Sequence, residues 1–346
     1  MKEILLVTDT WAPQVNGVVT TWKNIINYSK NNNTNFTLIH PYLFKNISWP
    51  FYKDIKLPLV TFKKIENLIE EINPEHIHIA TEGILGWHTR KYCNKRKINF
   101  TTSYHTKFPE FLKSLYGIPE KITYPIMKKF HSSSIATLVN TPTMKKELES
   151  KGFNNLIGWT RGVDRGLFKP NFDKKLRDII DPGGEKKIIL YVGRVSKEKN
   201  IKSFCKISKE REDYKLVIVG DGPIKKQLEK DYPKIIFTGF KHGNELVRYY
   251  SVADCCVFPS LNDTFGNTIL ESIACGTPVA AFPINGPIDI INQGVSGYFD
   301  SNLSYAIEET LKCSREYTLK TIEKYDWDQC IKILLATLDQ TESYKK

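Results

Sequence analysis

Short apolar runs alternate with amphipathic segments along the chain, in two successive rounds. Runs suited to buried parallel strands lie at 4–7, 36–39, 77–80, 100–104 and 136–140, and again at 188–192, 216–219, 235–237, 255–258 and 278–281. Helical patterns lie between them, including 65–72 and 143–151. Because βαβ units require this alternation, the pattern predicts an α/β fold. We expect two doubly wound, Rossmann-like domains facing each other across a cleft, with ligands at the carboxyl ends of the strands.

One polar, charged segment separates the two rounds. It runs from Lys169 to Lys187 and carries two prolines and two glycines, which are typical of a linker. We therefore predict an N-terminal domain at 1–168, a C-terminal domain at 169–325 and a helical tail at 326–346.

Composition places the chain among ordinary globular proteins. Of its 346 residues, 41% are hydrophobic and 25% are charged. No apolar run approaches the about 18 residues that a membrane-spanning helix needs. The N-terminus has a strand pattern without a signal-peptide cleavage site, so we expect a cytoplasmic protein. The seven cysteines form no CxxC pair, which favours reduced, structural thiols.

The formal net charge of +12 leaves nucleic acid, anionic membrane and phosphorylated ligands open as partners. Lysines and aromatic residues interleave in two segments, 41–64 and 107–129. Such segments suit peripheral contact with an anionic membrane surface. The candidate membrane or acceptor residues are Trp49, Phe51, Lys53, Lys107, Phe108 and Phe111. No nucleic-acid recognition motif is present, so we expect no nucleic-acid partner.

The segment from Asp263 to Glu271 carries the most specific chemistry. Asp263 fits a cap and the following residues through Gly266 fit an approach loop, with a helix starting near Asn267. The free N–H groups of a helix start bind anions. Eight residues return Glu271 to roughly the same helix face, so a phosphate could lie there while the carboxylates hold sugar hydroxyls. A capped amphipathic helix without a ligand is the alternative interpretation.

Other candidates follow strand ends. Arg194 and Lys199, after Gly193, could clamp a diphosphate, although a solvated charge run is the alternative. Gly239 and Phe240 could hold a nucleobase. His105 could donate to a sugar oxygen, but a lone histidine is more often structural.

Two further motifs are considered as ligand sites, one for a phosphate and one for a metal. The loop at Asn16 and Gly17 allows close approach of a phosphate, or it is a simple turn. Asp326-Trp327-Asp328 has the DxD spacing of a metal site but lies away from any predicted strand end, so we interpret it as a solvated helix and expect no metal.

Together these motifs resemble the retaining nucleotide-sugar glycosyltransferases of family 4, which have the two-domain GT-B fold. The resemblance rests on the Asn16-Gly17 loop, His105 in Thr-Ser-Tyr-His-Thr, Arg161-Gly-Val-Asp164, Arg194 with Lys199, Val-Gly-Asp-Gly-Pro223, and the stretch from Phe258 to Glu271. It implies catalytic roles for His105, Asp263, Arg194 and Lys199. It implies donor-binding roles for Asn16, Gly17, Gly193, Gly239, Phe240, Phe265, Gly266, Asn267 and Glu271.

In this family the opening motif is Glu-x7-Glu, so Asp263 replaces the first glutamate. Asp-Thr-Phe-Gly at this site is similar to the branch that makes glycolipids. The resemblance implies transfer of a hexose, glucose or glucuronic acid, from a UDP-sugar to diacylglycerol at the inner face of the cell membrane. No cofactor besides the nucleotide-sugar donor is expected. A GDP-mannose-dependent mannosyltransferase and a sugar-nucleotide-binding protein without turnover are the alternatives.

Overall fold

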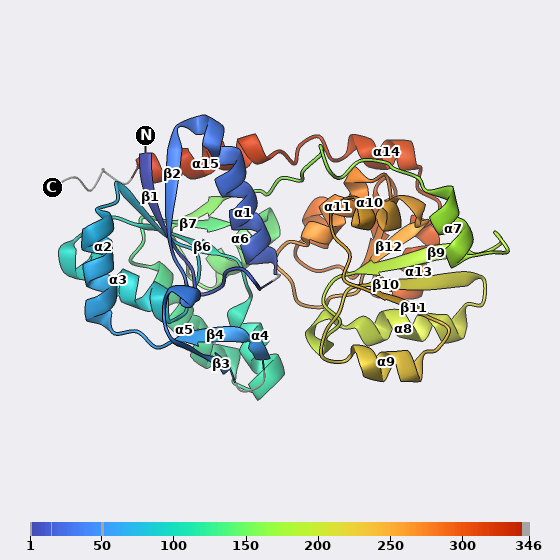
Figure 1. Cartoon of the computed structure of the whole chain (residues 1–346), viewed down its shortest axis with the longest axis horizontal. Coiled ribbons are helices and arrows are strands. Elements are labelled where there is room, and N and C mark those ends of the chain that lie inside the picture. The colour runs from blue at the N-terminus through green and yellow to red at the C-terminus, as the bar shows by residue number, and fades with distance from the viewer. Residues whose placement is uncertain (1, 15, 50–51, 341–346) are drawn as a thin grey trace. The chain divides into compact units, whose positions relative to one another are not determined.

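The computed structural model describes residues 2–14, 16–49 and 52–340, which form two compact units (Figure 1). The first unit comprises residues 1–161 with 327–346, and the second comprises 162–326. The division therefore lies at 161/162 and not at the expected 168/169. The reason is packing: Val163 is buried in the core of the second unit, Phe168 packs against that core, and the Val163 N–H donates to the Tyr325 carbonyl at 3.4 Å.

The first unit is built on a six-stranded parallel sheet with the order β2-β1-β5-β6-β7-β8. A two-stranded antiparallel hairpin, β3–β4, lies outside it. The strands are β1 (Lys2–Val7), β2 (Thr34–Ile39), β3 (Asn46–Trp49), β4 (Tyr52–Pro58), β5 (His76–Ile79), β6 (Thr101–Tyr104), β7 (Ala136–Val139) and β8 (Leu156–Gly158). The helices are α1 (Gly17–Ser29), α2 (Phe62–Ile72), α3 (Ile84–Arg96), α4 (Phe108–Tyr116), α5 (Glu120–His131), α6 (Pro142–Ser150) and α15 (Trp327–Asp339).

The second unit has a six-stranded parallel sheet with the order β11-β10-β9-β12-β13-β14, a Rossmann-like arrangement. The strands are β9 (Lys187–Val192), β10 (Tyr214–Val219), β11 (Ile236–Gly239), β12 (Cys255–Phe258), β13 (Val279–Ala281) and β14 (Gly297–Phe299). The helices are α7 (Lys174–Ile180), α8 (Ile201–Glu210), α9 (Lys225–Asp231), α10 (Gly243–Val252), α11 (Asn267–Ala274), α12 (Pro287–Ile290), α13 (Leu303–Thr310) and α14 (Arg315–Lys320).

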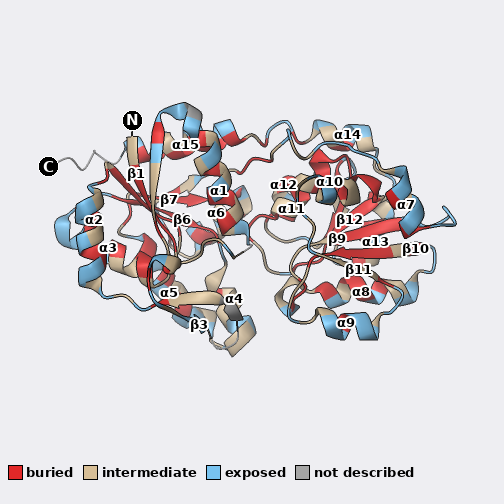
Figure 2. Cartoon of the chain, in the orientation of Figure 1, coloured by how far each residue is buried: buried red, intermediate tan, exposed pale blue. Residues whose placement is uncertain are grey.

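The predicted doubly wound fold is confirmed in both units. All ten predicted strands are present within a few residues of their expected bounds. In Figure 2 the strands are largely buried while the outer sides of the helices are exposed, which explains the continuous apolar runs. The edge strands β8 and β14 were not predicted, because three residues are too few to give a pattern.

The C-terminal helix α15 belongs to the core of the first unit. The expectation that residues 326–328 form a solvated segment is wrong for Trp327, which is buried. An apolar stripe on α15, including Leu334 and Leu338, packs with Trp22 and Trp159. The Trp159 indole N–H donates to the Cys330 carbonyl at 2.9 Å and ties the helix to the end of the sheet.

Replacing Trp159 by Phe is expected to lower the free energy of unfolding by about 1–3 kcal/mol, because it removes this hydrogen bond and leaves a smaller ring in a closed space. Thermal unfolding followed by circular dichroism measures the effect. Trp87→Phe is the matched control, since the Trp87 ring is only partly buried and a smaller loss is expected. Equal losses in the two variants would contradict a role for the Trp159 contact.

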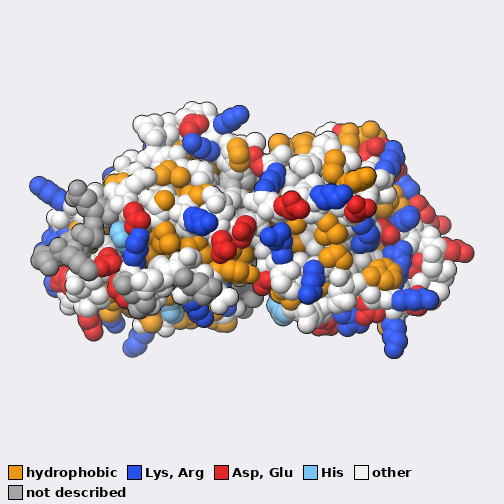
Figure 3. Space-filling model, turned by 90° about the horizontal axis from the view of Figure 1, so that it is seen from above, with side chains coloured by type: hydrophobic (Ala, Val, Ile, Leu, Met, Phe, Trp, Pro, Cys, Tyr) orange, Lys and Arg blue, Asp and Glu red, His pale blue; other side chains and the backbone are white. Residues whose placement is uncertain are grey.

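Charge is not segregated on the face of the second unit that Figure 3 shows. On this face, Lys and Arg side chains lie interspersed with Asp and Glu side chains (Figure 3). Among the described residues, no helix combines the length and apolar character needed to cross a membrane.

Candidate active site

The loops after β9 and β12 meet in the middle of the second sheet. These two strands are neighbours, and the strand order reverses between them. The β9 loop carries Gly193, Arg194 and Lys199, and the β12 loop carries Asp263. In open α/β sheets, ligands bind outside the carboxyl ends of the strands at this kind of switch point. The predicted candidates therefore come together where the fold favours a ligand.

Lys199 and Asp263 form an ion pair at this point. The Lys199 ammonium lies 2.7 Å from Asp263 Oδ2, and the Thr264 N–H donates to Asp263 Oδ1 at 3.0 Å. Burial works against the ammonium, but the charge and hydrogen bond of Asp263 outweigh it and raise the pKa of Lys199 above its usual value. Asn200 Nδ2 donates to the Pro259 carbonyl at 3.0 Å, which links the two loops. Lys199 is thus a fixed, fully charged cation.

Glycine backbones allow the neighbouring loops to approach closely. A Cβ atom on Gly220 would lie 1.9 Å from the Gly193 carbonyl oxygen, and one on Gly286 would lie 2.0 Å from the Phe265 carbonyl oxygen. Both glycines also have positive φ angles. The Arg194 backbone is held in place by the Tyr191 hydroxyl, which donates to the Arg194 carbonyl at 2.7 Å. Side chains at these glycines would push the loops apart.

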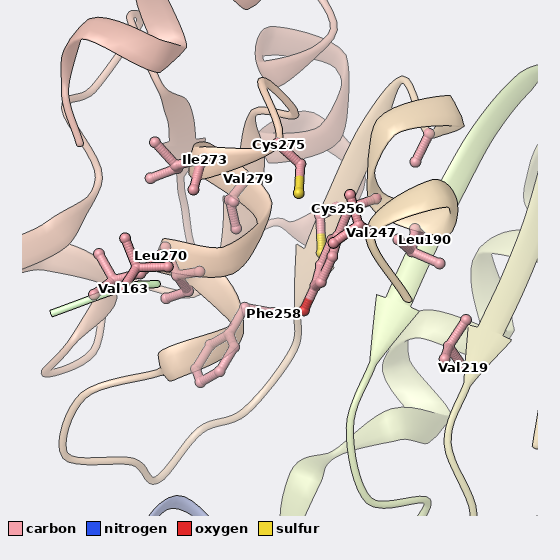
Figure 4. Packing of buried hydrophobic residues seen from close by; sticks show 14 of the residues in the cluster. Val163, Leu190, Val219, Val247, Cys256, Phe258, Leu270, Ile273, Cys275 and Val279 are labelled. Atoms are coloured by element: carbon pink, nitrogen blue, oxygen red, sulfur yellow. The ribbon is translucent and has the colours of Figure 1, made fainter. Parts of the chain in front are cut away.

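Helix α11 begins at the predicted residue, Asn267, directly after Gly266 in a left-handed conformation. Its apolar side, which includes Leu270 and Ile273, packs into the core that also contains Cys256 and Phe258 of β12 (Figure 4). This packing aims the helix start at the carboxyl end of the sheet. The first N–H groups of α11 therefore lie beside the loop that carries Asp263.

Glu271 lies on α11, one turn after its start. The Tyr250 hydroxyl donates to Glu271 Oε2 at 2.9 Å. Burial raises the pKa of Glu271 to about 7, and the hydrogen bond from Tyr250 opposes this shift only in part. The carboxyl group is consequently expected to titrate near pH 7. A ligand that donates hydrogen bonds to it favours the ionised form.

Gly239 and Phe240 mark the end of β11. Gly239 is the last residue of the strand and has a positive φ angle. The Phe240 ring is 54% exposed and stacks on His242, with ring centroids 6.1 Å apart. An exposed ring at a strand end can stack on a nucleobase, so the prediction for Phe240 remains consistent with its place.

In the first unit, His105 directly follows β6 and is buried. Its Nε2 lies 3.1 Å from the indole Nε1 of Trp22, and its Nδ1 lies 3.1 Å from Nη2 of Arg161. Both partners can only donate hydrogen bonds, whereas a neutral imidazole has one acceptor nitrogen. Only one contact at a time is therefore an N–H···N bond. Burial, then the charge of Arg161, holds the pKa of His105 well below its usual value.

His105 is thus expected to stay neutral from about pH 6 to about pH 8 and to supply no imidazolium proton. The chemical shift of its ring C2 proton, followed by NMR against pH, should not titrate in this range. Arg161→Met removes a charge and is expected to raise the His105 pKa part of the way toward 6.5, with burial still lowering it. An imidazole that titrates near its usual pKa in the unmodified protein would contradict this description.

The other candidates of the first unit lie on separate elements. Asn16 caps α1 through bonds from the Val18 and Val19 N–H groups, and Gly17 is the first residue of that helix. Lys107 pairs with Glu147 at 2.8 Å.

The aromatic candidates of this surface are only partly exposed. Phe108 and Phe111 are partly buried and stack with centroids 6.3 Å apart, and Trp49 donates to the Tyr116 hydroxyl. Phe51 and the Lys53 side chain fall outside the described residues. Membrane contact by these six residues stays a prediction.

Sequence reasoning assigned no individual role to four residues, namely Trp22, Tyr250, Arg161 and Asp9. Trp22 and Tyr250 contact the candidates through long-range packing, which no local pattern reveals. Arg161 was noted only as part of a motif.

The fourth is Asp9, at the end of β1. Its carboxylate accepts hydrogen bonds from the N–H groups of Gly83, Leu85 and Gly86 and so caps α3. Its place just after the first strand was the one sequence feature that could have identified Asp9 as a candidate. Within the described residues, no group of three or more His, Cys, Asp or Glu side chains is placed to hold a metal.

Two Rossmann-like units are the architecture of GT-B glycosyltransferases. Family comparisons agree. Residues 16–166 match the model "Glycosyltransferase Family 4", and residues 172–318 match "Glycosyl transferases group 1". The chain belongs to the family 4 glycosyltransferases.

The curated relatives include a mannosyltransferase and a glycolipid synthase. The chain is 31% identical over 337 residues to a GDP-mannose-dependent alpha-mannosyltransferase of Corynebacterium glutamicum, covering 91% of this chain and 80% of the relative. It is 27% identical to an alpha-monoglucosyldiacylglycerol synthase of Streptococcus pneumoniae, covering 92% and 80% respectively. A sucrose-phosphate synthase structure from Thermosynechococcus elongatus superposes with a TM-score of 0.79 at 18% identity, over 98% of this chain and 99% of that one, which shows the shared fold.

Proposed function

We propose that this glycosyltransferase moves a hexose, glucose or glucuronic acid, from a UDP-sugar to diacylglycerol, with retention of the anomeric configuration and without a metal ion. The observation that carries the proposal is the Lys199–Asp263 pair beside the start of α11. A fixed cation and the N–H groups of a helix start can neutralise a departing diphosphate, which is the task that a divalent ion performs in other transferases.

In the proposed reaction, the bond between the anomeric carbon and the phosphate oxygen breaks, and its electron pair leaves with the diphosphate. The acceptor hydroxyl attacks the same face of the sugar, and its proton passes to the departing phosphate oxygen. Arg194, Lys199 and the N–H groups of residues 265–267 stabilise the negative charge that develops. His105, held neutral, orients the sugar and does not act as a nucleophile.

Glu271 is assigned to the ribose hydroxyls of the donor. Its carboxyl group is partly buried, hydrogen-bonded by Tyr250 and placed one turn into α11. Asp263 is assigned to the transferred sugar as well as to Lys199. The first relative, a GDP-mannose-dependent enzyme, supports a second candidate function, mannosyl transfer from GDP-mannose to a lipid.

Radiolabelled donors separate the candidates. The purified protein is incubated with diacylglycerol in detergent and with UDP-glucose, UDP-glucuronic acid or GDP-mannose in parallel. Label in the lipid fraction with a UDP-sugar supports the first proposal, and label with GDP-mannose supports the second. Donor binding without transfer to any lipid or glycan would contradict both and would leave a binding protein without turnover.

A further inference from the structure

Helix α5 exposes an apolar pair that takes no part in the core. Ile122 is 53% exposed and Ile126 is 46% exposed. They are four residues apart and therefore lie on one side of the helix. The adjoining side packs inward through Met127 and Phe130, and Phe130 lies four residues after Ile126. The apolar stripe of the helix is therefore wider than the part that the core covers, and its outer edge faces solvent.

Lysines line the exposed side. Lys121 and Lys129 are exposed and flank the isoleucines in the sequence, Lys121 directly before Ile122 and Lys129 three residues after Ile126. Neither forms an ion pair within the part of the chain that the structure describes. The acidic residue of α5, Glu120, is engaged by Lys113 at 2.9 Å. The exposed side of α5 therefore carries uncompensated positive charge next to its apolar pair.

The helix is firmly attached to its neighbours. The Tyr124 hydroxyl donates to Glu110 Oε1 of α4 at 2.5 Å. The hairpin lies beside α4 in Figure 1, where Trp49 contacts Tyr116. Helix α5 is thus held to α4 and is not a loose segment.

We propose that α5 docks the protein on an anionic phospholipid bilayer, with Ile122 and Ile126 at the acyl boundary and Lys121 and Lys129 at the lipid phosphates. The proposal rests on the proposed function, whose acceptor is a membrane lipid. An aliphatic pair flanked by lysines suits an interfacial helix. Protein interfaces instead favour aromatic residues and arginine and are depleted in lysine. The contact surface therefore lies on α5, within the predicted segment 107–129, whereas Lys107 of the same segment is paired with Glu147.

Vesicle flotation tests the surface. The full chain is mixed with vesicles of phosphatidylcholine alone or with added phosphatidylglycerol. We expect binding to the anionic vesicles and a loss of about tenfold or more in the variant Ile122→Glu with Ile126→Glu. Lys121→Gln with Lys129→Gln is expected to lose about tenfold on anionic vesicles only. These side chains are exposed, so the melting temperature should not change. If Ile122→Glu with Ile126→Glu unfolds the protein, Ile122→Gln with Ile126→Gln replaces it.

Matched controls lie on the second unit. Ile179, on α7, is 74% exposed, and Ile179→Glu should bind anionic vesicles like the unmodified protein. Lys226→Gln with Lys230→Gln, on α9, changes the same charge as the lysine variant. If either control loses as much binding as its α5 counterpart, the assignment to α5 is overturned.

The outcomes separate this surface from the proposed function. If the α5 variants still transfer sugar to lipid in detergent but not on vesicles, the result supports the membrane-binding role of α5. Vesicle binding through α5 without transfer to any lipid would overturn the function and support the surface. The proposal that α5 binds membranes is overturned if the unmodified protein binds no anionic vesicle. It is also overturned if the protein binds polyglutamate beads and not vesicles, even if transfer in detergent persists.

Discussion

Replacing Lys199 by Ala is expected to lower the turnover number by about 10²–10³, the usual effect of removing one preorganised group that stabilises a developing negative charge. The ammonium is held 2.7 Å from Asp263, so no reorganisation is needed as the diphosphate departs. Steady-state kinetics with a saturating nucleotide-sugar donor measure the change. Lys202→Ala removes an exposed lysine of α8 and should leave turnover unchanged.

The partner of Lys199 gives the same experiment a second readout. In Asp263→Asn the ammonium loses its carboxylate, which no longer competes with the donor diphosphate for the cation. We expect the Michaelis constant for the donor to fall or stay level while turnover falls, because the ammonium is no longer held in one place. Turnover within about threefold of the unmodified protein in Lys199→Ala would remove this residue from the proposed mechanism.

The fold was predictable from the sequence because buried parallel strands leave continuous apolar runs. The short edge strand β8 left no such signal. Helix α15 was misread for a related reason: the charges of Asp326 and Asp328 flank Trp327 at the start of the helix and mask the apolar stripe that follows. Local charge says little about whether a helix returns to a distant core.

The location of the candidate site was predictable, because strand ends and helix starts position its residues. The contacts between those residues were not. Lys199 and Asp263 each follow a strand, so their place at one edge of the sheet followed from the fold. Their ion pair did not, because it joins loops 64 residues apart in the sequence. The two donor-only contacts of His105 are also distant in the sequence, at 83 and 56 residues, which is why the sequence left its role open between structural and functional.

Arg161 shows the limit most clearly. Its contact in the structure, His105, lies 56 residues away in the sequence. A motif can show that an arginine is required there, but only the fold shows that its charge helps to keep an imidazole neutral. A neutral imidazole has no imidazolium proton to deliver, so we expect His105 to orient a ligand and not to act as a general acid.

Donor affinity is expected to rise about tenfold from about pH 6 to about pH 8, because the Glu271 pKa of about 7 lies between these values. Ribose hydroxyls donate hydrogen bonds, so they bind the carboxylate and not the protonated acid. A complete nucleotide-sugar is the appropriate ligand, since its diphosphate is doubly esterified and does not titrate in this range. Isothermal titration calorimetry at each pH measures the affinity.

Glu271→Gln is the matched variant for this dependence, because it keeps the shape and removes the titration. It should bind the donor with a weak affinity that is nearly independent of pH. Linkage gives an independent check on the same group. A folded-state pKa raised from 4.5 to about 7 contributes stability below the unfolded value and loses it as the pH rises through 7. The free protein should therefore melt at a lower temperature at about pH 8 than at about pH 5.5, and Glu271→Gln should reduce that difference. An unchanged pH profile of donor binding in Glu271→Gln would assign the titration to another group and the ribose contact to another residue.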